Sequence, residues 1–140
     1  EIAKKYIDNG IMNISLADTS GHAYPEQVQR LFAGIKSINE DTTLTAHFHN
    51  TYGLGLTNCY YAMKEGAEYL ETAFGGLGGC PFTKLAAGNV STEDLVHSLN
   101  RNNIRRDINI DIIAEITKEA EEIFERKMQS YVVSAGQLKY

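Results

Sequence analysis

The strongest constraint on the fold of this 140-residue chain is a strand–loop–helix pattern that recurs roughly every thirty residues. Apolar patterning predicts strands that begin near residues 12, 43 and 69, with a segment of helical periodicity in each gap. Strands joined through helices pair in parallel, so the sequence predicts an α/β sheet. Three strands cannot close a barrel, since an eight-stranded βα barrel needs about 250 residues. The sheet is therefore either a small open one or a piece of a larger one.

Further elements follow from the same patterns. Helices are expected over residues 2–8, 25–38 and 55–64, and the third strand over 69–74. Ser91 to Asp94 matches a capping box that starts another helix. A long helix near 111–128 carries one apolar stripe, made of Ile112, Ile113, Ile116, Ala120, Ile123 and Phe124.

Composition narrows the class of protein. With 43% hydrophobic and 22% charged residues, the chain is an ordinary soluble globular protein, and 140 residues suffice for a core. A net charge of −5 argues against nucleic acid or an anionic membrane as the main partner. No apolar run reaches the roughly 18 residues of a membrane span, and no secretory signal is visible. Two cysteines give no disulfide framework, which favours a reducing compartment.

The most informative stretch is Thr43 to Gly55, TLTAHFHNTYGLG. It reads as a strand whose apolar side chains point one way while Thr45, His47 and His49 point the other. Two imidazoles on one strand face can meet the same metal ion, although paired histidines on an edge strand are often only solvated. The polar loop that follows lies where parallel α/β sheets bind their ligands.

All three predicted strands end in unusual loops. The first ends at Asp18, the second at His47 to Asn50, and the third in a glycine run that reaches Cys80. Because parallel strands end on one edge, a carboxylate, two imidazoles and a thiol are expected to converge there. Taken alone each signal is weak: Asp18 reads as a loop residue or helix cap, and the glycine run lacks the Lys-Ser/Thr of a P-loop. Cys59, in a helix among tyrosines, is expected to be a buried bystander.

Four segments, in their order and spacing, resemble the last three βα units of the 3-hydroxy-3-methylglutaryl-CoA lyase family: ISLADTSG, HFHNTYGLGLTN, GGLGGCPF and AAGNVSTEDLV. The HxH pair is shared across the wider superfamily of metal-dependent barrel lyases and Claisen-type synthases. The GGLGGCP loop is typical of the lyase, whereas the synthases carry a GERAGN-like loop that this chain lacks.

The resemblance implies the C-terminal three βα units of a TIM (β/α)8 barrel plus a C-terminal helix, with residues 1–140 as a partial catalytic domain. It implies Mg²⁺ or Mn²⁺ held by His47, His49 and Asn89, and catalytic roles for Cys80, Asp18 and again His47. Substrate-binding residues would be Asn50, Gly78 and Gly79. Asn50 stands where many lyases have Asp, and the family's Asp and Arg on the first strand and Glu on the second have no counterpart here.

The implied reaction is a metal-assisted retro-Claisen cleavage of hydroxymethylglutaryl-CoA to acetoacetate and acetyl-CoA. The expected partner is an acyl-CoA substrate, and the intact enzyme is expected to be a homodimer in a bacterial cytoplasm or a mitochondrial matrix. Two alternatives stay open: a Claisen-condensing synthase of the same superfamily, and a non-catalytic fragment. The first residues, EIAKKYIDNG, look like the end of a helix, so a fragment is expected. Because the family's Asp and Arg on the first strand are missing, this fragment is expected to be inactive alone.

Overall fold

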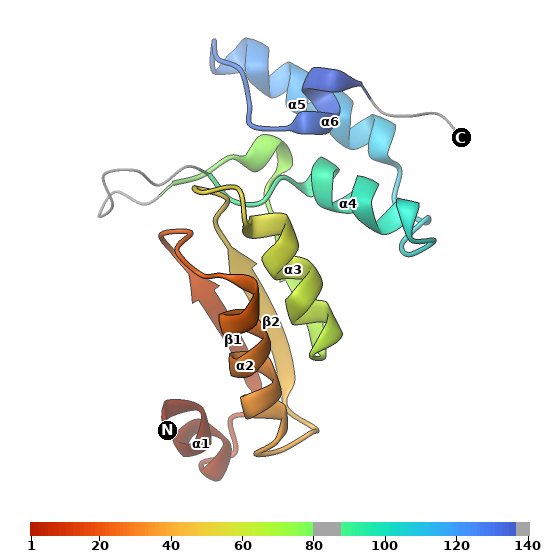
Figure 1. The fold of residues 1–140 in the computed structure, drawn as a ribbon. Helices are drawn as coiled ribbons and strands as arrows, with labels where there is room; N and C mark the ends of the chain where they lie inside the picture. Colours follow the sequence, from red (N-terminus) through yellow and green to blue (C-terminus); the bar gives the residue numbers. More distant parts are fainter. Residues whose placement is uncertain (80–87, 137–140) are drawn as a thin grey trace.

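The computed structural model describes residues 1–79 and 88–136. Three strands, β1 (Asn13–Asp18), β2 (Thr43–Phe48) and β3 (Ala67–Glu71), form a parallel sheet in the order β1-β2-β3 (Figure 1). The predicted parallel α/β sheet is confirmed. The third strand lies earlier than the predicted 69–74, because the chain leaves the sheet after Glu71 and Phe74 enters a 3₁₀ turn, η1 (Phe74–Gly76).

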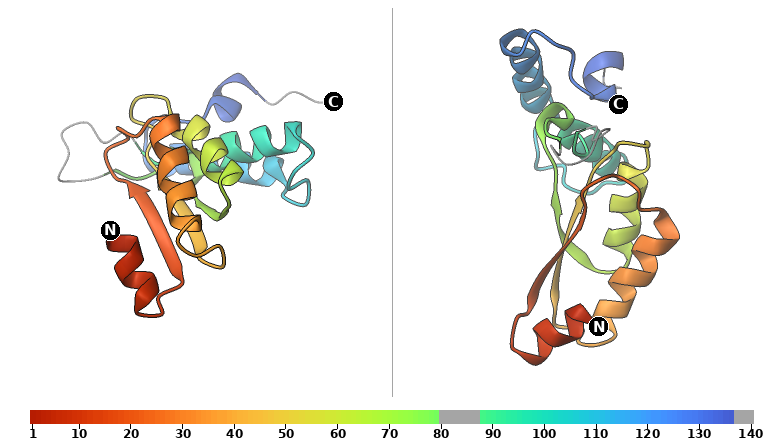
Figure 2. Two further views of the ribbon diagram at one scale, coloured as in Figure 1. Left: turned by 60° about the horizontal axis from the view of Figure 1, so that its bottom comes forward. Right: turned by 90° about the vertical axis from the view of Figure 1, so that its left-hand side faces the viewer.

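Helices cover only one face of this sheet. The chain begins with the short helix α1 (Ile2–Asp8). Helices α2 (Pro25–Lys36) and α3 (Gly55–Lys64) lie side by side on the covered face (Figure 1 and the right-hand view of Figure 2). The core between sheet and helices is made of buried apolar side chains, among them Val28, Phe32, Leu44, Ala46, Phe48, Cys59 and Ala62. The strand alternation that buries Leu44, Ala46 and Phe48 therefore turns Thr45 and His47 to the face without helices.

Three further helices lie beyond the carboxyl ends of the strands: α4 (Thr92–Arg101), α5 (Ile110–Ile123) and α6 (Tyr131–Ala135) (Figure 1). They stack on η1 and on one another, so they frame the edge of the sheet where the predicted site lies. The Ser91 cap is confirmed, because its hydroxyl accepts from the Asp94 backbone N–H at 3.3 Å. The Asp94 carboxylate does not complete a capping box, since it binds the start of α6.

The prediction for the long helix is partly wrong. Helix α5 ends at Ile123 rather than near Met128, and most of the expected apolar stripe is exposed. Thr117 and Ala120 are its buried residues, whereas Ile123 is 76% exposed. Periodicity located the helix, but the buried face is set by the polar contact that Thr117 makes with α4.

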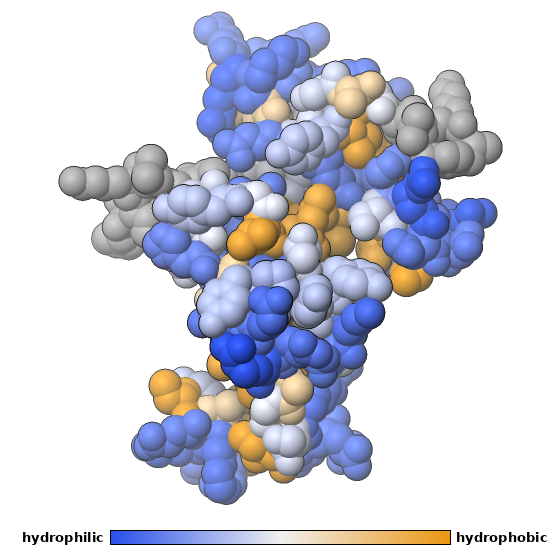
Figure 3. Space-filling view, viewed as in Figure 1, coloured by the Kyte–Doolittle hydropathy of each residue, from blue (hydrophilic) through white to orange (hydrophobic). Residues whose placement is uncertain are grey.

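The surface over the helices is mainly hydrophilic, with an apolar patch where the upper end of α3 meets the C-terminal helices (Figure 3). Among the helices of the described ranges, none combines the length and the hydropathy needed to span a bilayer.

Candidate active site

The two histidines of the HxH motif lie together at the carboxyl end of β2. Their ring centroids are 5.5 Å apart, with His47 part-exposed and His49 only 5% exposed. The backbone N–H of His49 donates to the carbonyl of Asp18 at 3.3 Å, which ties the ends of β1 and β2 together. The structure thus brings the main chain of Asp18 and the two imidazoles to one edge, while Cys80, the fourth member of the predicted group, lies outside the described residues.

Asn89 is held beside His49 by backbone pairing. The two residues form an isolated antiparallel bridge. On one side of it the Asn50 N–H donates to Gly88 O at 3.1 Å, and on the other the Val90 N–H donates to Phe48 O at 3.1 Å. A residue forty positions downstream is therefore fixed against the HxH motif by main-chain hydrogen bonds.

The side-chain amide of Asn89 has one group satisfied and one left over. Its Nδ2 donates to the Leu77 carbonyl at 2.9 Å, which fixes the orientation of the amide. Its Oδ1 is buried and finds no hydrogen-bond partner among the described residues. Thr42, Thr51 and Asn58 also have a buried side-chain oxygen without a partner among the described residues. What makes the Asn89 oxygen a candidate ligand is that its residue pairs with His49 of the HxH motif. Two imidazoles are typical ligands of Zn²⁺, Fe²⁺ or Ni²⁺, and an amide oxygen is a ligand that Mg²⁺ and Mn²⁺ accept. The donor set therefore fits a divalent ion without selecting which one.

The glycine run makes room for this asparagine. Gly78 has φ +127°, and a Cβ there would lie 2.5 Å from Asn89 Nδ2. A Cβ on Gly88 would lie 1.5 Å from the carbonyl oxygen of Gly76, so the two backbones pass in contact. The sequence analysis identified the run as unusual but not its packing role, because the close approaches join residues that are 11 and 12 positions apart.

Glu71 is a site residue that sequence reasoning missed. It is the last residue of β3, in register with His47 on β2, and its Oε2 lies 3.0 Å from His47 Nδ1. With Nδ1 occupied by this contact, Nε2 of His47 is the nitrogen left to face a ligand. The sequence could have pointed to Glu71 if the third strand had been predicted to end at residue 71, since its carboxylate would then lie at the end of that strand.

The carboxylate of Asp18 is used within its own loop. Oδ1 accepts the backbone N–H groups of Gly21 and His22 at 2.9 and 3.0 Å, and Oδ2 accepts that of Ala23 at 2.8 Å. These bonds fix the loop that enters α2. In this arrangement Asp18 shapes the rim of the site through its loop.

The predicted substrate-binding residues lie on the same rim. Asn50 caps the entry to α3 by accepting the Gly55 N–H at 2.9 Å, and it also lines a cavity of about 380 Å³. The opposite wall of that cavity comes from residues 128–131 and Ser134. Gly79 is exposed, and Cys80 lies outside the described residues.

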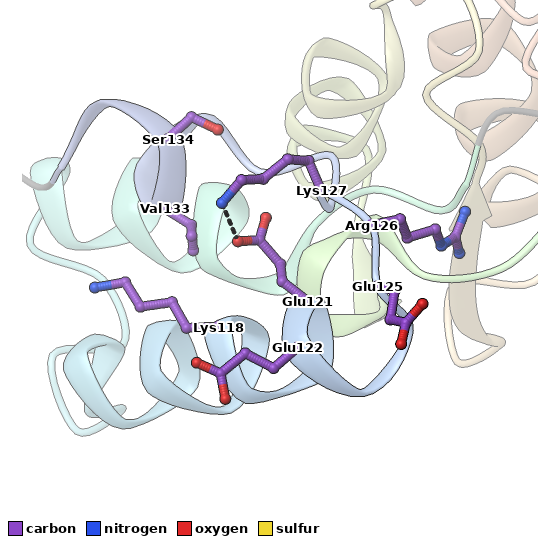
Figure 4. A pocket seen from close by; sticks show the side chains of 8 residues that line it. All are labelled: Lys118, Glu121, Glu122, Glu125, Arg126, Lys127, Val133 and Ser134. Carbon is purple, nitrogen blue, oxygen red and sulfur yellow. Dashed lines mark hydrogen bonds and ion pairs between the residues drawn. The ribbon is translucent and has the colours of Figure 1, made fainter.

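Two other features are separate from this site. Cys59 is buried in α3, and desolvation raises the pKa of its thiol to about 12, as expected of a bystander. A cavity of about 830 Å³ lies between α5 and α6 and is lined by no residue of the strand ends (Figure 4). Two of the charged residues that line it form an ion pair, with Lys127 Nζ 2.8 Å from Glu121 Oε2.

No group of three or more His, Cys, Asp or Glu side chains is arranged for a metal ion within residues 1–79 and 88–136. The candidate set therefore consists of His47, His49 and the Asn89 amide, all neutral ligands. Mg²⁺ and Mn²⁺ take about six ligands, so oxygen atoms from substrate, water or further protein groups would have to complete the shell.

Known proteins resemble the chain over most of its length. It is 44% identical over 99 residues to an (R)-citramalyl-CoA lyase of Chloroflexus aurantiacus, covering 71% of this chain and 31% of the relative. A mitochondrial hydroxymethylglutaryl-CoA lyase of Mus musculus is 36% identical over 135 residues, which are 96% of this chain and 42% of the relative. The chain thus spans less than half the length of either curated relative.

A solved structure agrees. An HMG-CoA lyase from Acinetobacter baumannii, in complex with coenzyme A and 3-methylmalate, superimposes with a TM-score of 0.88 at 40% identity. The match covers 97% of this chain and 45% of that structure. The expected piece of a TIM-barrel lyase fold is therefore confirmed. The model of the HMGL-like family matches residues 1–119, and the chain belongs to the HMGL-like family.

Proposed function

We propose that the protein cleaves 3-hydroxy-3-methylglutaryl-CoA to acetoacetate and acetyl-CoA with the help of Mg²⁺ or Mn²⁺. The observation that carries this proposal is the buried, unpaired Oδ1 of Asn89 beside the HxH motif. A polar atom left without a partner in a folded protein costs free energy, which a bound ion would recover. The likeness to lyases of this class over nearly the whole chain supports the same conclusion.

Each residue of the site has a distinct part in this reaction. His47, His49 and Asn89 would hold the ion, which supplies Lewis-acid stabilisation of charge that develops on oxygen when the carbon–carbon bond breaks. Asp18 fixes the neighbouring loop through three backbone N–H groups. Cys80 is proposed to donate the proton that the acetyl-CoA enolate carbon accepts. Asn50, Gly78 and Gly79 are proposed to contact the substrate.

A citramalyl-CoA thioester is a second candidate substrate. It is favoured by the relative at 44% identity, an (R)-citramalyl-CoA lyase, and by the 3-methylmalate in the Acinetobacter structure, an isomer of citramalate. The bond cleaved is of the same kind, but the products would be pyruvate and acetyl-CoA. The two candidates differ at the carbon that bears the hydroxyl: citramalyl-CoA carries a carboxylate there, and hydroxymethylglutaryl-CoA carries a carboxymethyl group.

The test is a cleavage assay on the protein as its gene encodes it, with each thioester in turn and with Mn²⁺ present. We expect acetyl-CoA from one of them, with acetoacetate or pyruvate identifying which. Variant His49→Ala should lose nearly all turnover and should bind Mn²⁺ more weakly. Condensation of acetyl-CoA with a 2-oxo acid, without cleavage of either thioester, would replace the lyase with the synthase alternative.

The role of Cys80 has its own test. We expect Cys80→Ser to abolish most turnover and to leave the metal content unchanged, because a hydroxyl is a far weaker acid than a thiol. Cys59→Ser is the matched control and should keep its turnover per folded molecule. A Cys80→Ser protein with retained activity would remove the thiol from the reaction.

We propose the remaining assignments on the same basis: an acyl-CoA as the partner molecule, a homodimer as the working assembly, and a bacterial cytoplasm or a mitochondrial matrix as the location. The relatives include an enzyme named as mitochondrial and one named as cytoplasmic. Size-exclusion chromatography with light scattering would test the assembly, with a monomer at working concentration as the opposing result.

A further inference from the structure

We propose that Glu71 is a positioning residue that sets the tautomer of His47 and strengthens divalent-metal binding at the site. This inference rests on the proposed function, since it takes His47 to be a metal ligand. It is carried by the contact of 3.0 Å between Glu71 Oε2 and His47 Nδ1 across adjacent parallel strands.

The contact is defined by the sheet and not by a flexible loop. His47 and Glu71 are Cα partners in the register of β2 and β3, so both side chains stand on the same sheet face. Among residues 1–79 and 88–136, no helix packs on that face (Figure 2, right-hand view). A shift of the strand register would break this pairing and would also move Ala46 and Leu70 from their partners.

A carboxylate at this place has two chemical consequences for His47. With Glu71 Oε2 at 3.0 Å from Nδ1, we expect the ring to carry its proton on Nδ1, which leaves the lone pair of Nε2 for the ion. The negative charge also attracts a cation bound at Nε2. It matters here because the ligands proposed for the dication, two imidazoles and an amide, are all neutral.

Within the described residues, the side chain of Glu71 is 55% exposed and that of His47 is 31% exposed. In the barrel of the related lyases this sheet face turns toward the remaining strands, so these values do not show how open to water the pair is there. The unfolding of each variant is therefore measured by circular dichroism before its Kd is compared. A change in metal affinity would then report on the site and not on a damaged structure.

Glu68 provides a matched control on the same strand. It lies on the opposite sheet face, 50% exposed, where it pairs with Lys36 at 3.2 Å. Glu68→Gln removes the same charge from β3 without touching His47. Any effect of net charge on the attraction of a cation would appear equally in both variants.

The experiment is a calorimetric titration of the full-length protein with Mn²⁺ alone, together with long-range ¹H–¹⁵N spectra of the histidine rings. We expect Glu71→Ala to raise the Kd for Mn²⁺ by about 10- to 100-fold and to remove the Nδ1–H tautomer of His47. Glu71→Gln, which keeps an acceptor oxygen, should keep the tautomer with a smaller loss of affinity. Glu68→Gln should match the wild type in both measurements.

The possible outcomes distinguish a failure of the proposed role of Glu71 from a failure of the proposed metal site. An unchanged Kd and an unchanged His47 tautomer in Glu71→Ala would overturn the positioning role, provided that His47→Ala weakens Mn²⁺ binding. If His47→Ala itself binds Mn²⁺ like the wild type, the metal site of the proposed function fails, and the inference fails with it.

Discussion

Two polar clusters of this molecule make opposite use of burial. At the junction of α4, η1 and α5, the carboxylate of Glu93 is fully buried, and both of its oxygens are satisfied. It accepts from the Gly75 N–H at 2.9 Å, from the Ser91 hydroxyl at 2.8 Å, and from the Thr117 hydroxyl. At the carboxyl end of β2, by contrast, the buried Oδ1 of Asn89 has no partner among the described residues.

The contrast separates a structural cluster from a ligand site. A satisfied network holds elements together, and its loss is felt as a loss of stability. A buried acceptor without a partner costs free energy in the folded protein, so its presence next to the HxH motif is the reason to infer a bound group there. The two clusters are close in sequence, only four residues apart at Asn89 and Glu93, yet they are expected to respond differently to substitution.

The largest effect on stability is expected at the satisfied cluster. Glu93→Ala should lower the free energy of unfolding by about 3 to 5 kcal/mol, because it leaves buried donors of Gly75, Ser91 and Thr117 without an acceptor. Urea denaturation followed by circular dichroism measures this loss. A cost below about 1 kcal/mol would show that the junction is not the stabilising network that the contrast requires.

A smaller loss is expected from Thr117→Val, which removes one donor to Glu93 while keeping the shape of the side chain. A hydrogen bond to a charged group is worth about 1.5 to 3 kcal/mol, so the same urea experiment should show a loss in that range. Combined with Glu93→Ala, the two losses should be less than additive, since both remove the same bond. Full additivity would mean that the hydroxyl acts elsewhere.

Cys59 tests whether burial by itself is a sign of a reactive group. Cys59→Ala should give the smallest loss of the three, about 1 kcal/mol in the free energy of unfolding at neutral pH. Desolvation raises the pKa of its thiol from 9.0 to about 12. The folded protein therefore keeps this proton more tightly than the unfolded chain. The associated stability is complete below pH 9 and is lost as the pH rises toward 12.

Unfolding measured between pH 8 and 11 should show this alkaline loss in the wild type and a reduced one in Cys59→Ala. Iodoacetamide at pH 8 should leave Cys59 unmodified in the folded protein. Rapid alkylation of Cys59 under these conditions would contradict its burial. It would also weaken the argument that hydrogen-bond partners, and not burial, distinguish the Glu93 cluster from the Asn89 cluster.

Much of the fold could be predicted from local patterns. The alternation around Leu44 and the helical spacing from Pro25 placed β1, β2, α2 and α3 to within two residues or so, because each of these elements buries one face against the same core. The end of β3 and the buried face of α5 could not be predicted, since they depend on contacts of Ala73 and Thr117 with distant segments.

The sequence predicted which residues gather at the candidate site, but not the contacts that hold them there. His47, His49 and Asn89 come together, and the loops that carry them share one edge of the sheet. The roles of Glu71 and of the close-packed Gly88 were not visible, because both arise from pairing between strands and loops and not from any motif along the chain.

The most direct test of the account is the stabilisation that Mn²⁺ gives to Asn89 variants. At a Mn²⁺ concentration about 100 times its Kd, the free energy of unfolding of the wild type should rise by about 2.7 kcal/mol. Asn89→Asp, which keeps an oxygen donor, should retain most of that gain, whereas Asn89→Ala should lose most of it. An equal gain in Asn89→Ala and the wild type would show that the unpaired oxygen holds no ion, and would contradict the account.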